Sequence, residues 1–414
     1  MWFKKKEKTK LQLLNESVAD LVKKSNDLIY DLGKQDSILH QALVEIQEKF
    51  DLIRNVPNEE QLKYQEVKNI SHSWKQQVDY IYNDFESAKK AEIGSGAAGG
   101  VLGAGVATLG PTAAMGVATT FGVASTGTAI SSLSGAAATN AALAWLGGGT
   151  LAAGGGGMAA GQLLLTLAGP VGWAIAVPTI FASVALYLWT KSEKNRLEEL
   201  FLLIGKRDEC SYKMAIVELN ERIKRVIDET KKLYKAIGLI ESFGTDYNSM
   251  TEEQQYTLGT YVNLMCSSTQ LLVNPIQGLQ PKFTLETLER YITFNTHHAG
   301  YCKKEKELIV YMANLLYGID TTEADRKLLS KSFRNNKDFI KKMKLEKRIK
   351  DILEPTVDES FYLSDKALEY FCKVNNDKSH GHNFTPKDGE SIAFTVTTKA
   401  GQRLDDNFLK YEEE

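Results

Sequence analysis

The chain has 414 residues, enough for two or three domains, and its 43% hydrophobic content supports packed cores. Its formal net charge of −2 argues against a nucleic-acid-binding protein, and its four cysteines are too widely spaced for a Cys-x-x-Cys metal site or a disulfide framework. The basic start, Met1 to Lys6, is not followed by the apolar region of a signal peptide. We therefore expect reduced thiols and a cytoplasmic protein, with any export by a non-Sec route.

Residues 11–53 repeat apolar side chains at alternating steps of three and four, which predicts a long helix with a coiled-coil seam. Ser25 and Gln35 fall on the same seam. A proline-containing turn ends this helix, and residues 59–91 continue the period. We expect an antiparallel hairpin that makes up an N-terminal domain, 1–92. The apolar seam positions of its first helix are Leu11, Leu14, Val18, Leu21, Leu28, Leu32, Leu39, Leu43 or Val44, Ile46, Phe50 and Ile53.

Residues 93–190 form a run of 98 residues without Asp, Glu, Lys, Arg or His. A charge in the hydrocarbon of a membrane costs about 3 kcal/mol on insertion scales, whereas a water-facing surface of this length normally carries charges. The run therefore predicts a hydrophobic, glycine-rich domain that inserts into a membrane. The alternatives are an unusually large pair of buried core helices and low-complexity filler.

The end of this run, residues 163–189, is its most apolar part, because 12 of these 27 residues are Leu, Ile, Val or Phe. A helix needs about 20 such residues to cross a bilayer. Aromatic side chains followed by Lys191 are typical of a membrane interface. The side chains that we expect to enter the membrane are Leu163, Leu164, Leu165, Trp173, Ile180, Phe181, Leu186, Tyr187 and Trp189.

The remainder of the run is rich in small residues, and the whole run holds 21 of the chain's 32 glycines. Small residues at four-residue steps let helix backbones pack closely in a membrane. Each glycine also costs a helix about 1 kcal/mol relative to alanine, so a fully helical form is weak. This favours conditional insertion over permanent membrane spans. The predicted glycine-zipper positions are Gly96, Gly100 and Ala104, and Gly149, Ala153, Gly157 and Gly161.

Apolar periodicity predicts a third long helix over residues 192–240, within a domain 191–245 that completes the bundle. The predicted fold is therefore mainly α: an elongated antiparallel helical bundle or coiled coil, carrying the insertion segment at one end. A C-terminal domain, 246–414, is expected to be mostly helical with a small β element.

In this C-terminal domain, Ser249 and Glu252 have the spacing of a capping box, and Thr322 with Asp325 offers a second cap. Six Lys or Arg residues between positions 341 and 350 indicate either a solvated helical face or a patch for lipid headgroups or a partner. The predicted helices cover residues 252–273, 285–294, 303–316 and 323–353, and the predicted strand covers 391–397.

Signatures of catalysis are lacking in the sequence. The glycine runs do not end in Gly-Lys-Ser/Thr, so they do not form a phosphate loop. His297-His298 and His380-x-His382 have no cysteines or paired carboxylates at ligand spacing. We predict no catalytic, cofactor-binding or metal-binding residues, no cofactor and no enzymatic activity.

Long helices that bracket an apolar, glycine-rich insert give residues 11–240 an architecture that resembles the α-helical pore-forming toxins of the cytolysin A type. The glycine-zipper insert is similar to that of apolipoprotein L proteins. The insert is much longer than the cytolysin hairpin, and no residue role is carried over. The resemblance implies a pore-forming toxin or a cell-death or defence effector that changes from a soluble form to an oligomeric membrane form.

The partners expected from this interpretation are a lipid membrane, further copies of the chain and a regulatory protein, with no nucleic acid. The protein would be cytoplasmic when soluble and membrane-associated when active. The alternative is a non-lytic membrane-anchored scaffold or tether whose helices bind a partner protein.

Overall fold

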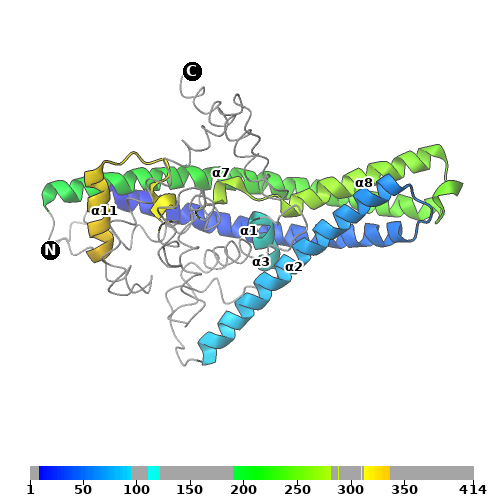
Figure 1. The fold of residues 1–414 in the computed structure, drawn as a ribbon, viewed down its shortest axis with the longest axis horizontal. Helices are drawn as coiled ribbons and strands as arrows, with labels where there is room; N and C mark the ends of the chain where they lie inside the picture. Colours follow the sequence, from blue (N-terminus) through cyan, green and yellow to red (C-terminus); the bar gives the residue numbers. More distant parts are fainter. Residues whose placement is uncertain are drawn as a thin grey trace, which may run out of the picture.

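The computed structural model describes residues 9–94, 111–121, 190–280 and 312–335, together with Leu288 and Ile309. All regular elements within these ranges are helices, and the longest of them lie along the long axis of the molecule (Figure 1). The predicted mainly α, elongated helical architecture is confirmed. The predicted strand 391–397, the helix 285–294 apart from Leu288, and the basic positions 341–350 lie outside the described residues.

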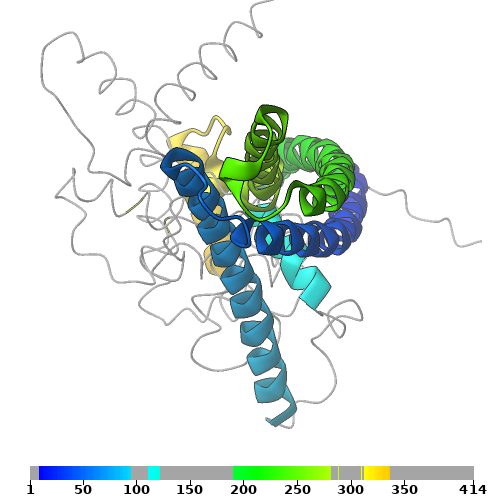
Figure 2. The same ribbon diagram turned by 90° about the vertical axis from the view of Figure 1, so that its right-hand side faces the viewer.

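The first hairpin consists of α1 (Lys10–Asp51) and α2 (Asn58–Gly94). A capping box between Thr9 and Gln12 starts α1, because each side chain accepts a hydrogen bond from the other residue's backbone N–H. The Tyr64 hydroxyl, near the start of α2, donates to Gln47 O, 2.9 Å away near the end of α1. Figure 2 shows that α2 runs back at an angle to α1.

The second hairpin consists of α7 (Lys191–Ile240) and α8 (Glu252–Val273), in agreement with the predicted ranges. The predicted cap of α8 is wrong, because Thr251 and Gln254 form the capping box in place of Ser249 and Glu252. Ser249 belongs to a short 3-10 helix, η5 (Tyr247–Ser249), and its hydroxyl donates to the backbone. Thr251 is the extended residue directly before the helix, where a side-chain oxygen can cap it.

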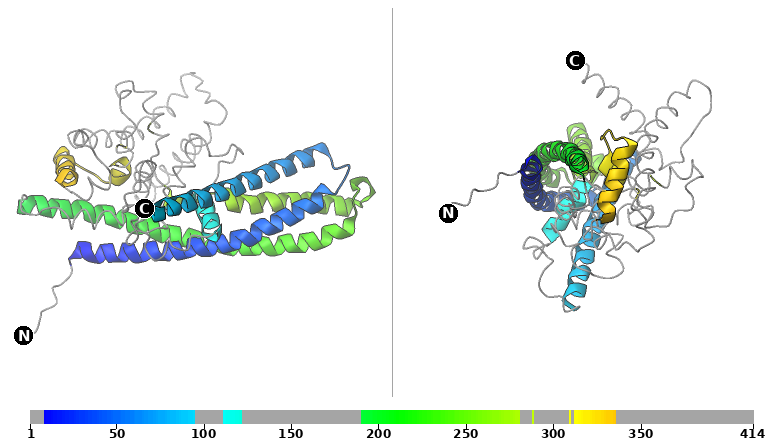
Figure 3. Two further views of the ribbon diagram at one scale, coloured as in Figure 1. Left: turned by 90° about the horizontal axis from the view of Figure 1, so that it is seen from below. Right: turned by 90° about the vertical axis from the view of Figure 1, so that its left-hand side faces the viewer.

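The two hairpins lie side by side, with α1 and α7 parallel (Figure 3). Three side-chain contacts join α1 or its turn to α7 or its turn, at separations of 191 or 192 positions: Ser17 with Glu209, Lys49 with Glu241, and Asn55 with Asp246. A constant separation along two helices means that they keep one parallel register. Both turns therefore lie at the same end of the bundle, where Arg54 N donates to Thr245 O over 2.9 Å.

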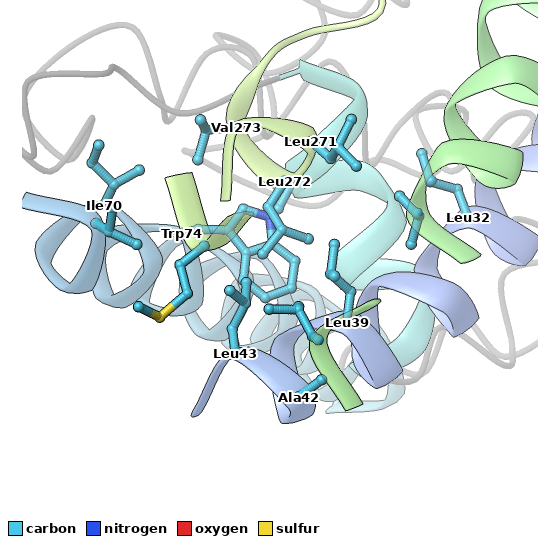
Figure 4. Packing of buried hydrophobic residues seen from close by; sticks show 14 of the residues in the cluster. Leu32, Leu39, Ala42, Leu43, Ile70, Trp74, Leu271, Leu272 and Val273 are labelled. Atoms are coloured by element: carbon cyan, nitrogen blue, oxygen red, sulfur yellow. The ribbon is translucent and has the colours of Figure 1, made fainter. Parts of the chain in front are cut away.

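Two further helices cover this frame. The short helix α3 (Pro111–Phe121) contacts α1, α2 and α8, and α11 (Glu323–Asn335) contacts α7. The core between the hairpins is apolar, and Trp74 of α2 lies in it between leucines of α1 and α8 (Figure 4). The residues labelled in that view are Leu32, Leu39, Ala42, Leu43, Ile70, Trp74, Leu271, Leu272 and Val273.

Candidate functional site

The candidate site is the place where the uncharged segment lies against the helical body. Between residues 95 and 189 the structure describes only α3, so α3 is the part of the uncharged segment whose contacts are known. The C-terminal half of α3 is covered on all sides, since Val117, Thr119 and Thr120 are each 0% exposed. Part of a chain segment without any charge is thus packed into the core formed by α1, α2 and α8.

Two glycines allow α3 to cross α1 at very short range. A Cβ atom placed on Gly33 would lie 2.0 Å from Thr112 O, and one placed on Gly116 would lie 2.0 Å from Ile29 O. Neither position can carry a side chain unless the backbones separate. The crossing therefore depends on glycine in both helices, as in other close backbone approaches.

Neutral hydrogen bonds hold the C-terminal end of α3. Trp74 Nε1 donates to Thr119 Oγ1 over 3.2 Å. Thr120 O accepts hydrogen bonds from Ile276 N, at 2.8 Å, and from Gln280 Nε2, at 3.1 Å, so the end of the helix has partners for a carbonyl that lacks one within α3. Because α3 contains no charged residue, it can leave this position without the separation of an ion pair.

A buried carboxyl lies beside α3. Asp36 of α1 is 0% exposed, and no described residue donates a well-formed hydrogen bond to either of its oxygens. Burial raises the pKa of Asp36, while the nearby Thr119 hydroxyl and the Arg222 guanidinium oppose that rise. Arg222 directs its own hydrogen bonds to the end of α8, donating to Leu271 O and Asn274 O over 2.6 and 2.7 Å.

The other border of the uncharged segment is fixed where α7 begins. Thr190 caps α7 in a capping box with Glu193. The Glu193 carboxylate also accepts a hydrogen bond from Lys331 of α11 over 2.7 Å, and these contacts lower its pKa to about 2. Arg196 donates to both carboxylate oxygens of Asp325, at 2.7 and 2.8 Å. These two ion pairs, Glu193 with Lys331 and Arg196 with Asp325, join α11 to the first turns of α7, directly after the segment. We call them the clasp.

The residues that the sequence predicted to enter the membrane, and those predicted to form the zipper, lie outside the described residues. None of the described helices is both long enough and apolar enough to span a membrane. The first set is Leu163, Leu164, Leu165, Trp173, Ile180, Phe181, Leu186, Tyr187 and Trp189, and the second is Gly96, Gly100, Ala104, Gly149, Ala153, Gly157 and Gly161.

The described ranges also contain no cluster of three or more His, Cys, Asp or Glu side chains that could hold a metal ion. Cys210 and Cys266 are free thiols, and the positions of Cys302 and Cys372 lie outside the described residues. Burial raises the pKa of the Cys266 thiol, which disfavours its thiolate.

Sequence reasoning missed the contacts that hold α3. Gly33 is a single glycine inside the long apolar pattern of α1, a position that often marks a close packing contact. Asp36 lies four residues after Leu32 and three before Leu39, so it is a charged residue on the seam itself. Both signals are visible in the sequence, but neither says which segment packs against them.

Comparison of the chain with protein-family models, with curated proteins and with solved structures gave no match. The resemblance to cytolysin A type toxins and apolipoprotein L proteins therefore stays a prediction. What the molecule itself offers is an uncharged segment of 98 residues and a helical body that buries one helix of it.

Proposed function

We propose that this protein is a conditional membrane-inserting protein that permeabilises membranes as an oligomer, in the role of a toxin or a cell-death or defence effector. The observation that supports this most directly is α3. This helix belongs to a 98-residue run without charges and is buried in the helical body. It is held there by the close glycine crossing with α1 and by hydrogen bonds between uncharged groups. Such an arrangement suits storage of a membrane-seeking segment until a trigger releases it.

In this proposal, release of α3 frees the segment to which it belongs. Residues 163–189 are apolar enough to enter lipid first, and the glycine-rich part follows as a packing partner through its four-residue steps. Gly149, Ala153, Gly157 and Gly161 then form helix contacts within the membrane, either inside one chain or between copies. The soluble form is cytoplasmic, and a regulatory protein partner controls release.

Dye release from lipid vesicles tests this function when the crossing is opened by mutation. Gly33→Ala places a Cβ where it would lie 2.0 Å from Thr112 O, so α3 must shift from its place. We expect Gly33→Ala to permeabilise vesicles at least about tenfold faster than the native chain, because a loss of 1–3 kcal/mol is typical of overpacking. The matched control is Gly238→Ala, because nothing lies within 4 Å of a Cβ at that helical position.

The control should behave like the native chain. If Gly33→Ala and the native chain bind vesicles tightly and stay there without leakage, the pore proposal fails and the tether is favoured. If neither chain binds vesicles under any condition, membrane insertion itself is rejected.

A further inference from the structure

Asp36 lies where α1, α3 and α7 meet. It follows Gly33 by three residues, so it lies on the face of α1 that α3 crosses. It is 0% exposed, with Thr119 of α3 and Arg222 of α7 as its polar neighbours. Since α3 helps to cover this face, α3 helps to keep water from the carboxyl.

A carboxyl in this position destabilises the packing around it. Burial of a polar group without a hydrogen bond costs about 1–3 kcal/mol, and a buried charge costs more. The Thr119 hydroxyl and the positive charge of Arg222 offset only part of this cost, because burial still raises the pKa of Asp36. The hydrogen bonds of Arg222 go to the carbonyl groups at the end of α8, and Asp36 is left without a well-formed one. The cost falls away when α3 leaves and water reaches Asp36.

We propose that Asp36 is a built-in release device, whose ionisation weakens the packing of α3 against the helical body and favours the released state. The proposal rests on the function proposed above only in assuming that α3 can leave its place. It deepens that function by naming the group that keeps the stored state metastable.

The direction of the pH dependence follows from linkage. Burial raises the pKa of Asp36 well above its ordinary value of 3.8 in the packed state, so the packed state binds the proton more tightly. The contribution of Asp36 to the packing of α3 is therefore complete below pH 3.8 and is lost as the pH rises through the pKa of the packed state. Across that window one proton changes the ratio of released to packed α3 by about tenfold for each pH unit.

Other groups around this site titrate differently. The ring of His40 on α1 lies tilted against Trp74, with 5.2 Å between the ring centroids. Burial lowers the pKa of His40 from 6.5, so acid weakens that contact. This effect is opposite in sign to that of Asp36. The charged groups that act on Arg222 or His40 besides Asp36 are Arg225 and Glu218 of α7 and Lys75 and Asp79 of α2, while α3 has no charged residue.

Pulsed electron paramagnetic resonance measures release directly. Nitroxides are attached to cysteines introduced at the exposed positions Pro111 of α3 and Val44 of α1, in the full chain without its four native cysteines. We expect one short distance at low pH and a growing population of longer distances as the pH rises. Asp36→Asn should abolish the growth of the longer distances with rising pH and leave only the opposite effect of His40 at low pH. Asp36→Leu should keep α3 packed as the pH rises.

The matched control is Asp208→Asn, which neutralises another buried carboxyl that lies on α7 and pairs with Arg207. It should keep the native pH dependence of α3. If Asp36→Asn also keeps it, or if the native distances do not change with pH, the release device is overturned. If the distances depend on Asp36 but vesicles never leak, the device stands and the pore function falls.

Discussion

The carboxyl of Asp208 shows how a buried charge is handled when it has a partner. It is 1% exposed and accepts a hydrogen bond from Arg207 Nη2 over 2.8 Å. Arg207 also donates to Leu315 O and Tyr317 O, at 2.9 and 2.6 Å, and so ties α7 to the C-terminal region. Burial nevertheless outweighs this pairing, because the pKa of Asp208 is raised. Asp36 differs in that neither of its oxygens has a well-formed hydrogen bond.

Asp208→Asn should flatten part of the pH dependence of stability. Burial raises the pKa of Asp208 to about 6, against an ordinary 3.8, so its contribution to stability is complete below pH 3.8 and is lost as the pH rises through about 6. This difference corresponds to roughly 3 kcal/mol of unfolding free energy. Urea unfolding of both chains between pH 4 and about 8 measures it. Parallel curves for the two chains would contradict the raised pKa.

The sequence predicted the apolar seam of α1, but at some steps it did not predict which of two neighbouring residues is buried. Leu43 is buried and Val44 is exposed, and the buried polar position is Asp36, with the expected Gln35 only half-buried. Ser25 is buried on the seam as predicted. A repeat of threes and fours admits either neighbour at such steps, because the two differ by only about 100° around the helix. The elements packed on α1 decide between them, and these are distant in sequence.

At the scale of whole elements, the long helices were predictable because their caps and their apolar periodicity indicate the same boundaries and the same buried face that the packing requires. The predicted ranges 192–240 and 252–273 differ from α7 and α8 by at most one residue at either end, since caps and apolar periodicity mark both. Helix α3 was not predicted. Its 11 residues offer mostly Ala, Gly and Thr, and its place depends on Gly33, 83 residues before Gly116. Only a tertiary contact reveals that pair.

The clasp between α7 and α11 should weaken when Asp325 is neutralised. Arg196 lowers the pKa of Asp325, so this contribution to stability is present above the ordinary 3.8 and is lost as the pH falls. Asp325 also accepts hydrogen bonds from Thr322 N and Oγ1 at the start of α11, a cap that asparagine can keep through its amide oxygen. Asp325→Asn should raise amide hydrogen exchange in α11 by about tenfold, as expected for the loss of the charge-assisted pair with Arg196. Glu323→Gln is the control, because the side chains of Glu323 and Lys327 are 67% and 56% exposed and such pairs contribute little. Equal exchange in both variants would count against the clasp.

For the molecule as a whole, the parallel arrangement of the two hairpins determines where the two ends of the uncharged segment join the helical body. Both turns lie at one end, and α2 runs back from that end while α7 starts away from it (Figures 1 and 3). The borders of the segment, Gly94 of α2 and Thr190 before α7, are therefore both remote from the turns. A segment released from such a body can enter a membrane while the turns remain outside.

Under the proposed function, the charges at these borders predict how often the segment would cross the membrane. Lys89 and Lys90 precede it, and Lys191, Lys194 and Arg196 follow it. If the basic borders stay on the side from which insertion starts, the chain crosses an even number of times. A helix of 98 residues would be about 147 Å long, against a hydrocarbon core of about 30 Å, so four crossings are the upper limit. We expect two, because only residues 163–189 are apolar enough to insert unaided.

Cysteines at positions 90 and 192, in a chain without the four native cysteines, report this topology. After insertion into vesicles, an impermeant maleimide added outside should label both positions, since two crossings return the chain to its starting side. Labelling after detergent lysis gives the full signal for each position and corrects for differences in reactivity. Protection of one position and labelling of the other would require an odd number of crossings. A basic border would then have passed through the hydrocarbon, at a cost of about 3 kcal/mol for each charge, and the hairpin would be excluded.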